Sequence, residues 1–159
     1  MTYVDKDYSS SSSNGGAPPQ GTFHAGVALS LELRAAANTV VIPTIRTVAA
    51  DLAARADFDL DSIDDLRMAV DDLCAMLVRI AAAGATLRCR FTVSPERIEV
   101  AADIEVEDPT EPLSTRTFGW RVLECLADDV RAVSLPGAVG ERDRVCITVA
   151  KDAATAPQL

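Results

Sequence analysis

Apolar residues recur at intervals of three and four along residues 61–81, which predicts an amphipathic helix with one face on a protein core. Ser62 is placed to cap this helix, and Asp65 follows three residues later as a short capping-box partner. A second face carries Asp65, Asp72 and Arg79 at spacings of seven, and we expect any chemistry to lie there. The apolar positions are Ile63, Leu66, Ala69, Val70, Leu73, Leu77 and Ile80.

Alternating apolar and polar residues predict strands elsewhere in the chain, beginning with Val27, Leu29, Leu31 and Leu33. A hairpin is expected over residues 87–104, with its turn at Ser94–Glu96. Two more strands are expected near residues 130–135 and 144–150, joined by a turn with Gly137 and Gly140. The inward hairpin positions are Leu87, Cys89, Phe91, Val93, Ile98, Val100, Ala102 and Ile104; the outward ones, Arg88, Arg90, Arg97, Glu99 and Asp103, suit cross-strand ion pairs.

Two further segments have helical periodicity. Asn38 could cap the first, but Pro43 suits a first-turn position, so we expect this helix to run from about Pro43 to just before Asp57. The second spans residues 115–130. The inward positions are Ile42, Ile45, Val48, Ala49, Leu52 and Ala53 in the first, and Phe118, Val122, Leu123 and Leu126 in the second.

This order of elements predicts an α/β fold, a two-layer sandwich with three helices on one face of a mostly antiparallel sheet. Residues 27–150 form the expected domain. Residues 1–26, with a serine run at Ser9–Ser13, have too few apolar side chains to offset the entropy of ordering and are expected to be a disordered tail. Residues 151–159 are expected to form a second tail.

A length of 159 residues, with 48% hydrophobic and 25% charged residues, suits one domain. No apolar run approaches the roughly 20 residues that span a bilayer, and no secretory signal is evident, so we expect a cytoplasmic protein without membrane contact. The cysteines at 74, 89, 125 and 146 show no CxxC pairing, which argues against structural zinc and favours small buried thiols.

The net charge of -9 argues against a nucleic-acid surface, because neutralising phosphates needs clustered lysine and arginine. An acidic protein more naturally meets a basic protein partner, and opposite charges speed association. The alternative is that the acidity only maintains solubility.

The segment from Arg46 to Leu73 reads RTVAADLAARADFDLDSIDDLRMAVDDL. It resembles, without a gap, RsbW-type anti-sigma factors, the GHKL-fold serine kinases of bacterial partner switching. The resemblance extends from about residue 27 to 149 and is greatest to actinobacterial members that restrain sigma-F-like factors. It implies a sandwich of the GHKL (histidine-kinase ATPase) type, a role in stress response, and homodimers. It also implies two partners, a sigma factor and an anti-anti-sigma factor with a STAS domain.

In that family the helix presents a glutamate as general base and, four residues later, an asparagine that binds Mg²⁺. These places fall on Asp72 and Met76. Asp72 is one methylene shorter than glutamate, and a thioether is a poor ligand for a hard cation. The family's adenine-binding aspartate has only Asp103 and Asp108 as displaced candidates, and of its later glycine motif only Gly119 remains.

These residues allow plainer interpretations. Asp71 and Asp72 could be a solvated helix face, Met76 a packing residue, and Gly119 a place where helices approach closely. Trp120 could be a partner anchor or a core residue. The resemblance carries Arg46 onto an exposed arginine that contacts both partners, and the alternative is an ordinary surface arginine.

The sequence therefore predicts an anti-sigma factor that sequesters an alternative sigma factor and is released by an anti-anti-sigma factor. The expected nucleotide site is degenerate, with no metal and no cofactor. The alternative is a serine kinase that uses ATP and Mg²⁺, with Asp72 as base, to phosphorylate the anti-anti-sigma factor. A third possibility is a structural or heterodimerising paralogue without a sigma target.

Overall fold

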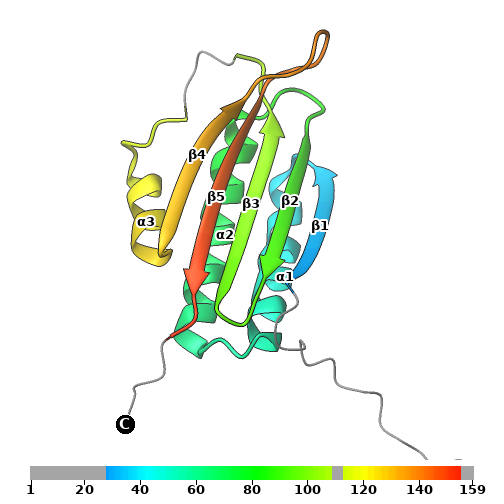
Figure 1. The fold of residues 1–159 in the computed structure, drawn as a ribbon. Helices are drawn as coiled ribbons and strands as arrows, with labels where there is room; N and C mark the ends of the chain where they lie inside the picture. The colour runs from blue at the N-terminus through cyan, green and yellow to red at the C-terminus, as the bar shows by residue number, and fades with distance from the viewer. Residues whose placement is uncertain (1–27, 109–112, 155–159) are drawn as a thin grey trace, which may run out of the picture.

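The computed structural model describes residues 28–108 and 113–154. Val27, the predicted tail over residues 1–26, and residues 155–159 of the second tail lie outside the described residues. The elements follow the predicted order (Figure 1). They are β1 (Leu29–Ala36), a 3-10 turn η1 (Thr39–Val41), α1 (Ile42–Arg55), α2 (Leu60–Ile80), β2 (Thr86–Val93), β3 (Arg97–Glu105), α3 (Phe118–Leu126), β4 (Asp129–Leu135) and β5 (Arg144–Asp152).

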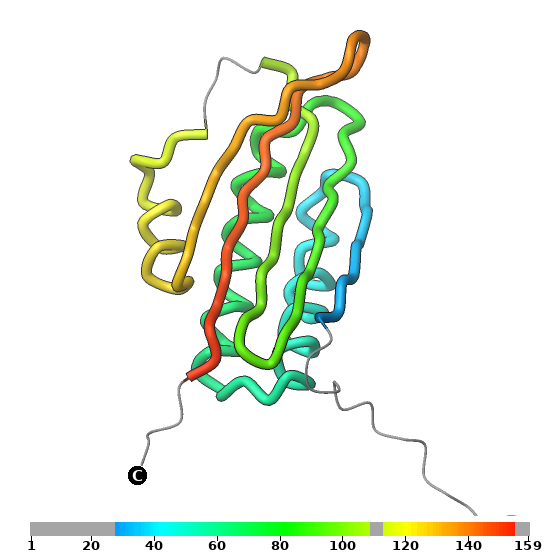
Figure 2. Tube along the Cα trace, viewed as in Figure 1, coloured from blue at the N-terminus to red at the C-terminus, as the bar shows by residue number. Residues whose placement is uncertain are grey.

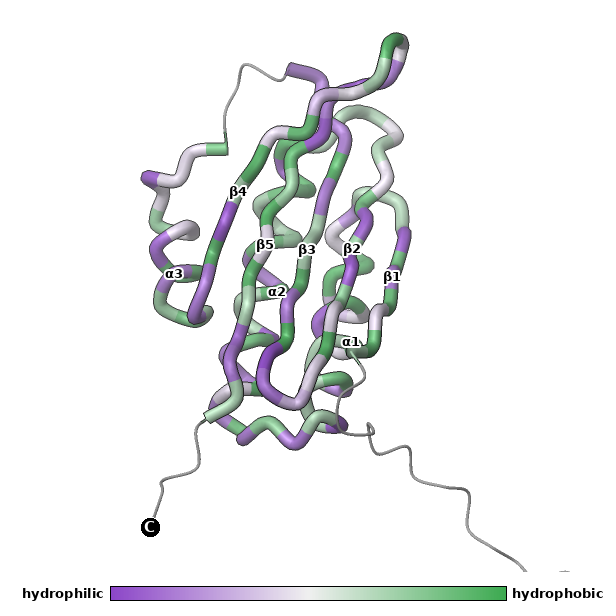
Figure 3. Tube along the Cα trace, viewed as in Figure 1, coloured by the Kyte–Doolittle hydropathy of each residue, from purple (hydrophilic) through white to green (hydrophobic). Residues whose placement is uncertain are grey.

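The strands form one five-stranded sheet in the order β1-β2-β3-β5-β4, and every neighbouring pair is antiparallel. An antiparallel α/β fold with three helices is thus confirmed, and it is consistent with the GHKL type. Hydropathy alternates along the strands (Figure 3), as a sheet with one packed face requires. The eight inward hairpin positions are at most 1% exposed, as predicted: Leu87, Cys89, Phe91, Val93, Ile98, Val100, Ala102 and Ile104.

Helices α1 and α2 lie behind the sheet, and the chain trace places α3 beside β4 (Figures 1 and 2). Helix α3 packs against both α2 and β4. Helix α1 begins one residue before Pro43, close to the predicted start, and Asn38 caps η1 instead. Of the six inward positions predicted for α1, all but Val48 are fully buried. The chain turns from α1 to α2 at Asp57, which has a φ of 59°.

The start of α2 differs from the prediction. Its N-cap is Asp59, whose carboxylate accepts hydrogen bonds from the Ser62 backbone N–H at 2.9 Å and the Ser62 hydroxyl at 2.7 Å. Ser62 is therefore a donor inside the first turn, and the predicted Ser62 cap is wrong. Asp65 is no capping-box partner, because its carboxylate accepts from Lys151 Nζ at 3.0 Å. Both corrections have one cause: the N-cap residue is Asp59, three residues before Ser62.

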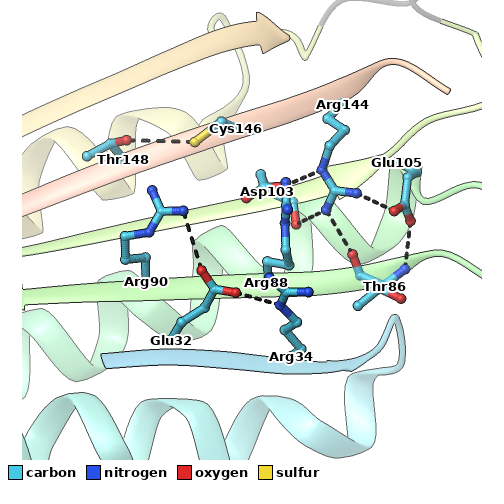
Figure 4. Close-up of polar contacts among 10 residues, drawn as sticks. All are labelled: Glu32, Arg34, Thr86, Arg88, Arg90, Asp103, Glu105, Arg144, Cys146 and Thr148. Atoms are coloured by element: carbon cyan, nitrogen blue, oxygen red, sulfur yellow. Dashed lines mark hydrogen bonds and ion pairs between the residues drawn. The ribbon is translucent and has the colours of Figure 1, made fainter. Parts of the chain in front are cut away.

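No described element covers the outer face of the sheet (Figure 1). Charged side chains on this face form ion pairs between strands. Arg88 pairs with Asp103 across β2 and β3 at 2.9 Å, and Arg131 pairs with Glu99 across β4, β5 and β3 at 3.0 Å. Arg144 contacts both Asp103 and Glu105 (Figure 4). The predicted cross-strand ion pairs are therefore confirmed.

Three further expectations are corrected. Phe118 does not face inward, since it is 83% exposed at the start of α3. Strand β5 runs to Asp152, so residues 151 and 152 belong to the sheet and not to a tail. Only Cys74 and Cys89 are fully buried, while Cys125 is exposed and Cys146 is half-buried. Within residues 28–108 and 113–154, no helix has the length and apolar character needed to span a membrane.

Candidate functional site

A cavity of about 450 Å³ lies beside the acidic pair of α2. Its lining comes from three helices. Helix α1 contributes one arginine, α2 contributes charged residues and a methionine, and α3 contributes two apolar residues. The cavity is thus on the side of α2 that faces away from the sheet. It is lined by Arg46, Arg67, Met68, Asp71, Asp72, Val122 and Leu126. We call Met68, Val122 and Leu126 the apolar wall.

The periodicity of α2 and α3 explains this placement. Met68 and Asp72 are four residues apart on α2, and Val122 and Leu126 are four apart on α3, so each pair shares one helix face. The opposite face of α2 is committed to the core, where Leu66, Val70 and Leu73 are at most 1% exposed. The polar residues of α2 are consequently turned toward the groove between α1 and α3.

Charges in the cavity are mostly paired. Arg46 Nη1 donates to Asp71 Oδ1 at 2.9 Å, joining α1 to α2, and Arg67 pairs with Asp64 at 3.1 Å along α2. Asp72 is half-buried and has no hydrogen bond or ion pair among the described residues. Burial raises the pKa of the Asp72 carboxyl, and the neighbouring Asp71 carboxylate raises this pKa further. Asp72 is therefore the carboxylate of this cavity that is left for a ligand.

Met76 does not reach the cavity. It is 5% exposed and lies under the first turn of α3, where a Cβ added at Gly119 would be 3.6 Å from its sulfur. The structure thus favours a packing role for Met76. A contact of 3.6 Å is ordinary van der Waals distance, so Gly119 is not required for close approach of the helices.

The remaining nucleotide-site candidates lie elsewhere. Asp103 is on the outer face of the sheet, where it accepts from Arg88 and Arg144, and the sheet separates it from α2 (Figure 4). Asp108 is exposed and follows β3 by three residues. The structure brings neither of them together with Asp72 in the lining of the cavity.

The two partner-binding candidates have different surroundings. The Arg46 side chain is 44% exposed but is held by its ion pair with Asp71. Trp120 is 6% exposed, and its Nε1 donates to Glu124 at 2.9 Å, so it fits the core alternative better than the anchor alternative. Arg67 and Met68 also line the cavity, although they were not among the site residues predicted from the sequence. The spacing of four between Met68 and Asp72 was the available signal.

The cavity does not fit the family's magnesium chemistry. Where the family places an oxygen ligand, this chain has a thioether directed into packing, and hard cations prefer oxygen. In the described part of the chain, no three or more His, Cys, Asp or Glu side chains are grouped to hold a metal ion. Within residues 28–108 and 113–154, the arrangement offers one carboxylate without a partner beside an apolar wall, a combination that can bind a cation with an apolar stem.

No protein-family model matches the chain. The chain is 36% identical over 102 residues to a protein named anti-sigma-F factor RsbW in Mycobacterium tuberculosis (strain CDC 1551 / Oshkosh). The same identity and length hold for the protein of that name in strain H37Rv. The match covers 64% of this chain, which spans about 60% of the length of these curated relatives. The resemblance to actinobacterial RsbW-type anti-sigma factors predicted from the sequence is thereby confirmed.

Proposed function

We propose that this chain, which resembles RsbW-type anti-sigma factors, is a cytoplasmic anti-sigma factor whose nucleotide site is degenerate. It binds an alternative sigma factor, denies it to RNA polymerase, and is released when an anti-anti-sigma factor with a STAS domain takes its place. The observation that carries the proposal is the 36% identity over 102 residues with relatives named anti-sigma-F factor. As in that family, we expect the chain to act as a homodimer in a stress response.

The degenerate site is supported by the placement of the candidate residues. Met76 is packed under α3, and Asp103 is neutralised by two arginines on the other side of the sheet. A phosphoryl-transfer site needs a base, a metal ligand and donors around the phosphates in one place. Of the candidates named from the sequence for base, metal and nucleotide, the cavity lining contains only Asp72.

The test is binding and transcription with purified components. The chain is mixed with each alternative sigma factor of its own organism, and complexes are detected by size-exclusion chromatography with light scattering. We expect one of them to form a stable complex and to lose transcription from its promoter, with the housekeeping sigma factor as control. Adding the anti-anti-sigma factor should restore transcription. Failure of every alternative sigma factor to bind would contradict the proposal.

A serine kinase is the second candidate, and one observation favours it: Asp72 lies in a cavity, without a partner among the described residues, where a base would be needed. The chain, radiolabelled ATP, Mg²⁺ and the anti-anti-sigma factor are incubated together. The leading proposal expects no phosphoserine. Label that disappears in Asp72→Asn would establish the kinase instead.

A further inference from the structure

We propose that the cavity between α1, α2 and α3 receives one lysine or arginine side chain of the bound sigma factor, with the cation on Asp72 and the methylene stem on the apolar wall. This inference rests on the proposed function, since the occupant belongs to the sigma factor. It gives the degenerate site a role of its own, as the place that fixes the partner's position.

The charge of the cavity favours a cation. Both arginines that line it already have carboxylate partners, at 2.9 Å for Arg46 and 3.1 Å for Arg67. Among the residues that the structure describes, Asp72 is the charged residue of the cavity lining that has no partner. A nucleoside triphosphate would bring several negative charges against this carboxylate, whereas an ammonium or guanidinium group would neutralise it. Removing the carboxylate from water also costs less when it gains a partner.

The shape of the cavity favours a long side chain with an apolar stem. Its volume of about 450 Å³ is within the range of about 300–1,000 Å³ that ligand pockets have. Lysine and arginine bury their methylene groups on apolar surface while the charged head stays polar. Met68, which is 47% exposed, can adapt to such a stem because methionine is flexible.

Helix α3 carries another exposed apolar side chain, Phe118, one turn before Val122 of the apolar wall. Phe118 precedes Val122 by four residues on α3, so both share a face of this helix, and Phe118 is 83% exposed. Exposed aromatic residues beside a pocket are typical of protein interfaces. A protein segment can contact the cavity and Phe118 together, which a small free cation cannot do. Among proteins, sigma factors bind DNA through clustered lysine and arginine, and this chain has a net charge of -9.

The experiment measures the Kd of the full chain for its sigma factor by calorimetry. Asp72→Asn keeps the side-chain shape and removes the charge, and we expect it to weaken binding by about tenfold or more. Asp61→Asn is the matched control, because Asp61 is an exposed acid in the first turn of the same helix and does not line the cavity. It should bind within about twofold of the unchanged chain. Equal Kd values for Asp72→Asn and the unchanged chain would overturn the inference.

A double-mutant cycle then identifies the occupant. Each lysine and arginine of the sigma factor is changed to alanine and measured against both the unchanged chain and Asp72→Asn. We expect one basic residue whose effect largely disappears in Asp72→Asn, because the pair is already broken. If every basic residue acts independently of Asp72, the cation does not lie there. Thermal unfolding of each variant verifies that the fold is intact.

A probe that needs no sigma factor separates the two proposals. n-Butylguanidinium is titrated into the labelled chain by NMR, and amide shifts around Asp72 are expected in the unchanged chain but not in Asp72→Asn. If no sigma factor binds, the proposed function and the proposed occupant both fail. If a sigma factor binds but neither the Asp72 cycle nor this titration shows coupling, the proposed function stands and the inference fails.

Discussion

At the scale of single residues, Asp103 shows how much a side chain's role depends on its strand neighbours. Its carboxylate accepts from Arg88 on β2 and from Arg144 on β5, and the three side chains are 13%, 32% and 16% exposed. Two guanidinium groups thus share one carboxylate across the middle of the sheet. Losing that carboxylate would leave the partly buried Arg88 without its ion pair and Arg144 with Glu105 alone, which costs more than losing a surface pair.

We therefore predict that Asp103→Asn lowers the free energy of unfolding by about 2 to 3 kcal/mol. The matched control is Glu99→Gln, the same amide substitution in an ion pair whose side chains are 56% and 36% exposed. It should cost no more than about 1 kcal/mol. Urea unfolding of both variants measures the difference. Similar values for the two would mean that the Asp103 cluster adds no more than a surface pair.

The cysteines give a second prediction at this scale. Cys74 is fully buried, and its contact with the Cys89 thiol together with burial raises the pKa of Cys74 well above the usual range. Cys125 is exposed. Because the thiolate is the reactive form, an aromatic disulfide reagent at mild alkaline pH should modify Cys125 quickly and Cys74 and Cys89 only after unfolding. Cys125→Ser should remove the fast phase, and a fast phase that survives this change would contradict the assignment.

At the scale of elements, the N-cap of α2 makes the stability of the folded chain depend on pH. The backbone and hydroxyl hydrogen bonds from Ser62 lower the pKa of the Asp59 carboxyl below its ordinary value of 3.8. The unfolded chain then binds the proton more readily than the folded chain, so stability is gained above the unfolded pKa and lost as the pH falls through the folded pKa.

We predict that Asp59→Asn, which keeps a good cap but cannot titrate, is less stable than the unchanged chain at neutral pH. The difference should shrink as the pH falls below about 3.8 and the aspartate takes up its proton. Urea unfolding at several pH values measures it, with the exposed Asp61→Asn as control. A difference that stays constant with pH would show that the charge of Asp59 does not contribute.

Elements were predicted well where the signal is local. The alternation of Leu87 to Val93 and the spacing of Leu66, Val70 and Leu73 each depend on one segment, and both faces were identified correctly. The cap of α2 was misplaced because Asp59 and Ser62 are both good capping residues, and their mutual hydrogen bonds decide between them. The burial of Phe118 was overestimated, since a single turn at a helix start shows no periodicity.

The cavity could not be predicted in the same way. It depends on Arg46 meeting Asp71, 25 positions later, and on α3 lying across α2. No periodic pattern encodes such a pairing of helices. The resemblance to RsbW-type proteins made Asp103 a candidate for the nucleotide site. The alternation of side chains along β3, however, predicts that Asp103 lies with Arg88 on the outer face of the sheet. The local pattern was the better guide to where this side chain lies.

At the scale of the whole molecule, net charge is expected to affect the rate of association with a partner more than the rate of dissociation. The chain has 24 acidic and 15 basic side chains. Long-range attraction between this acidic protein and the proposed sigma-factor partner would act on the encounter, and salt screens such attraction over a Debye length of about 10 Å at 0.1 M. The contact proposed for the α1–α2–α3 cavity forms only after docking, and salt screens a partly buried pair less than an exposed one.

We accordingly predict that raising the salt concentration from about 0.02 M to about 0.5 M slows association with the proposed sigma-factor partner by about tenfold or more. The dissociation rate should change by less than about threefold, because it reflects the docked contacts. Asp72→Asn should have the opposite effect: the association rate should stay nearly unchanged, and the dissociation rate should rise. Stopped-flow association and surface-based dissociation measure the two rates. Salt-independent association would mean that net charge serves only solubility, and slow dissociation of Asp72→Asn would place the partner's contacts outside the cavity.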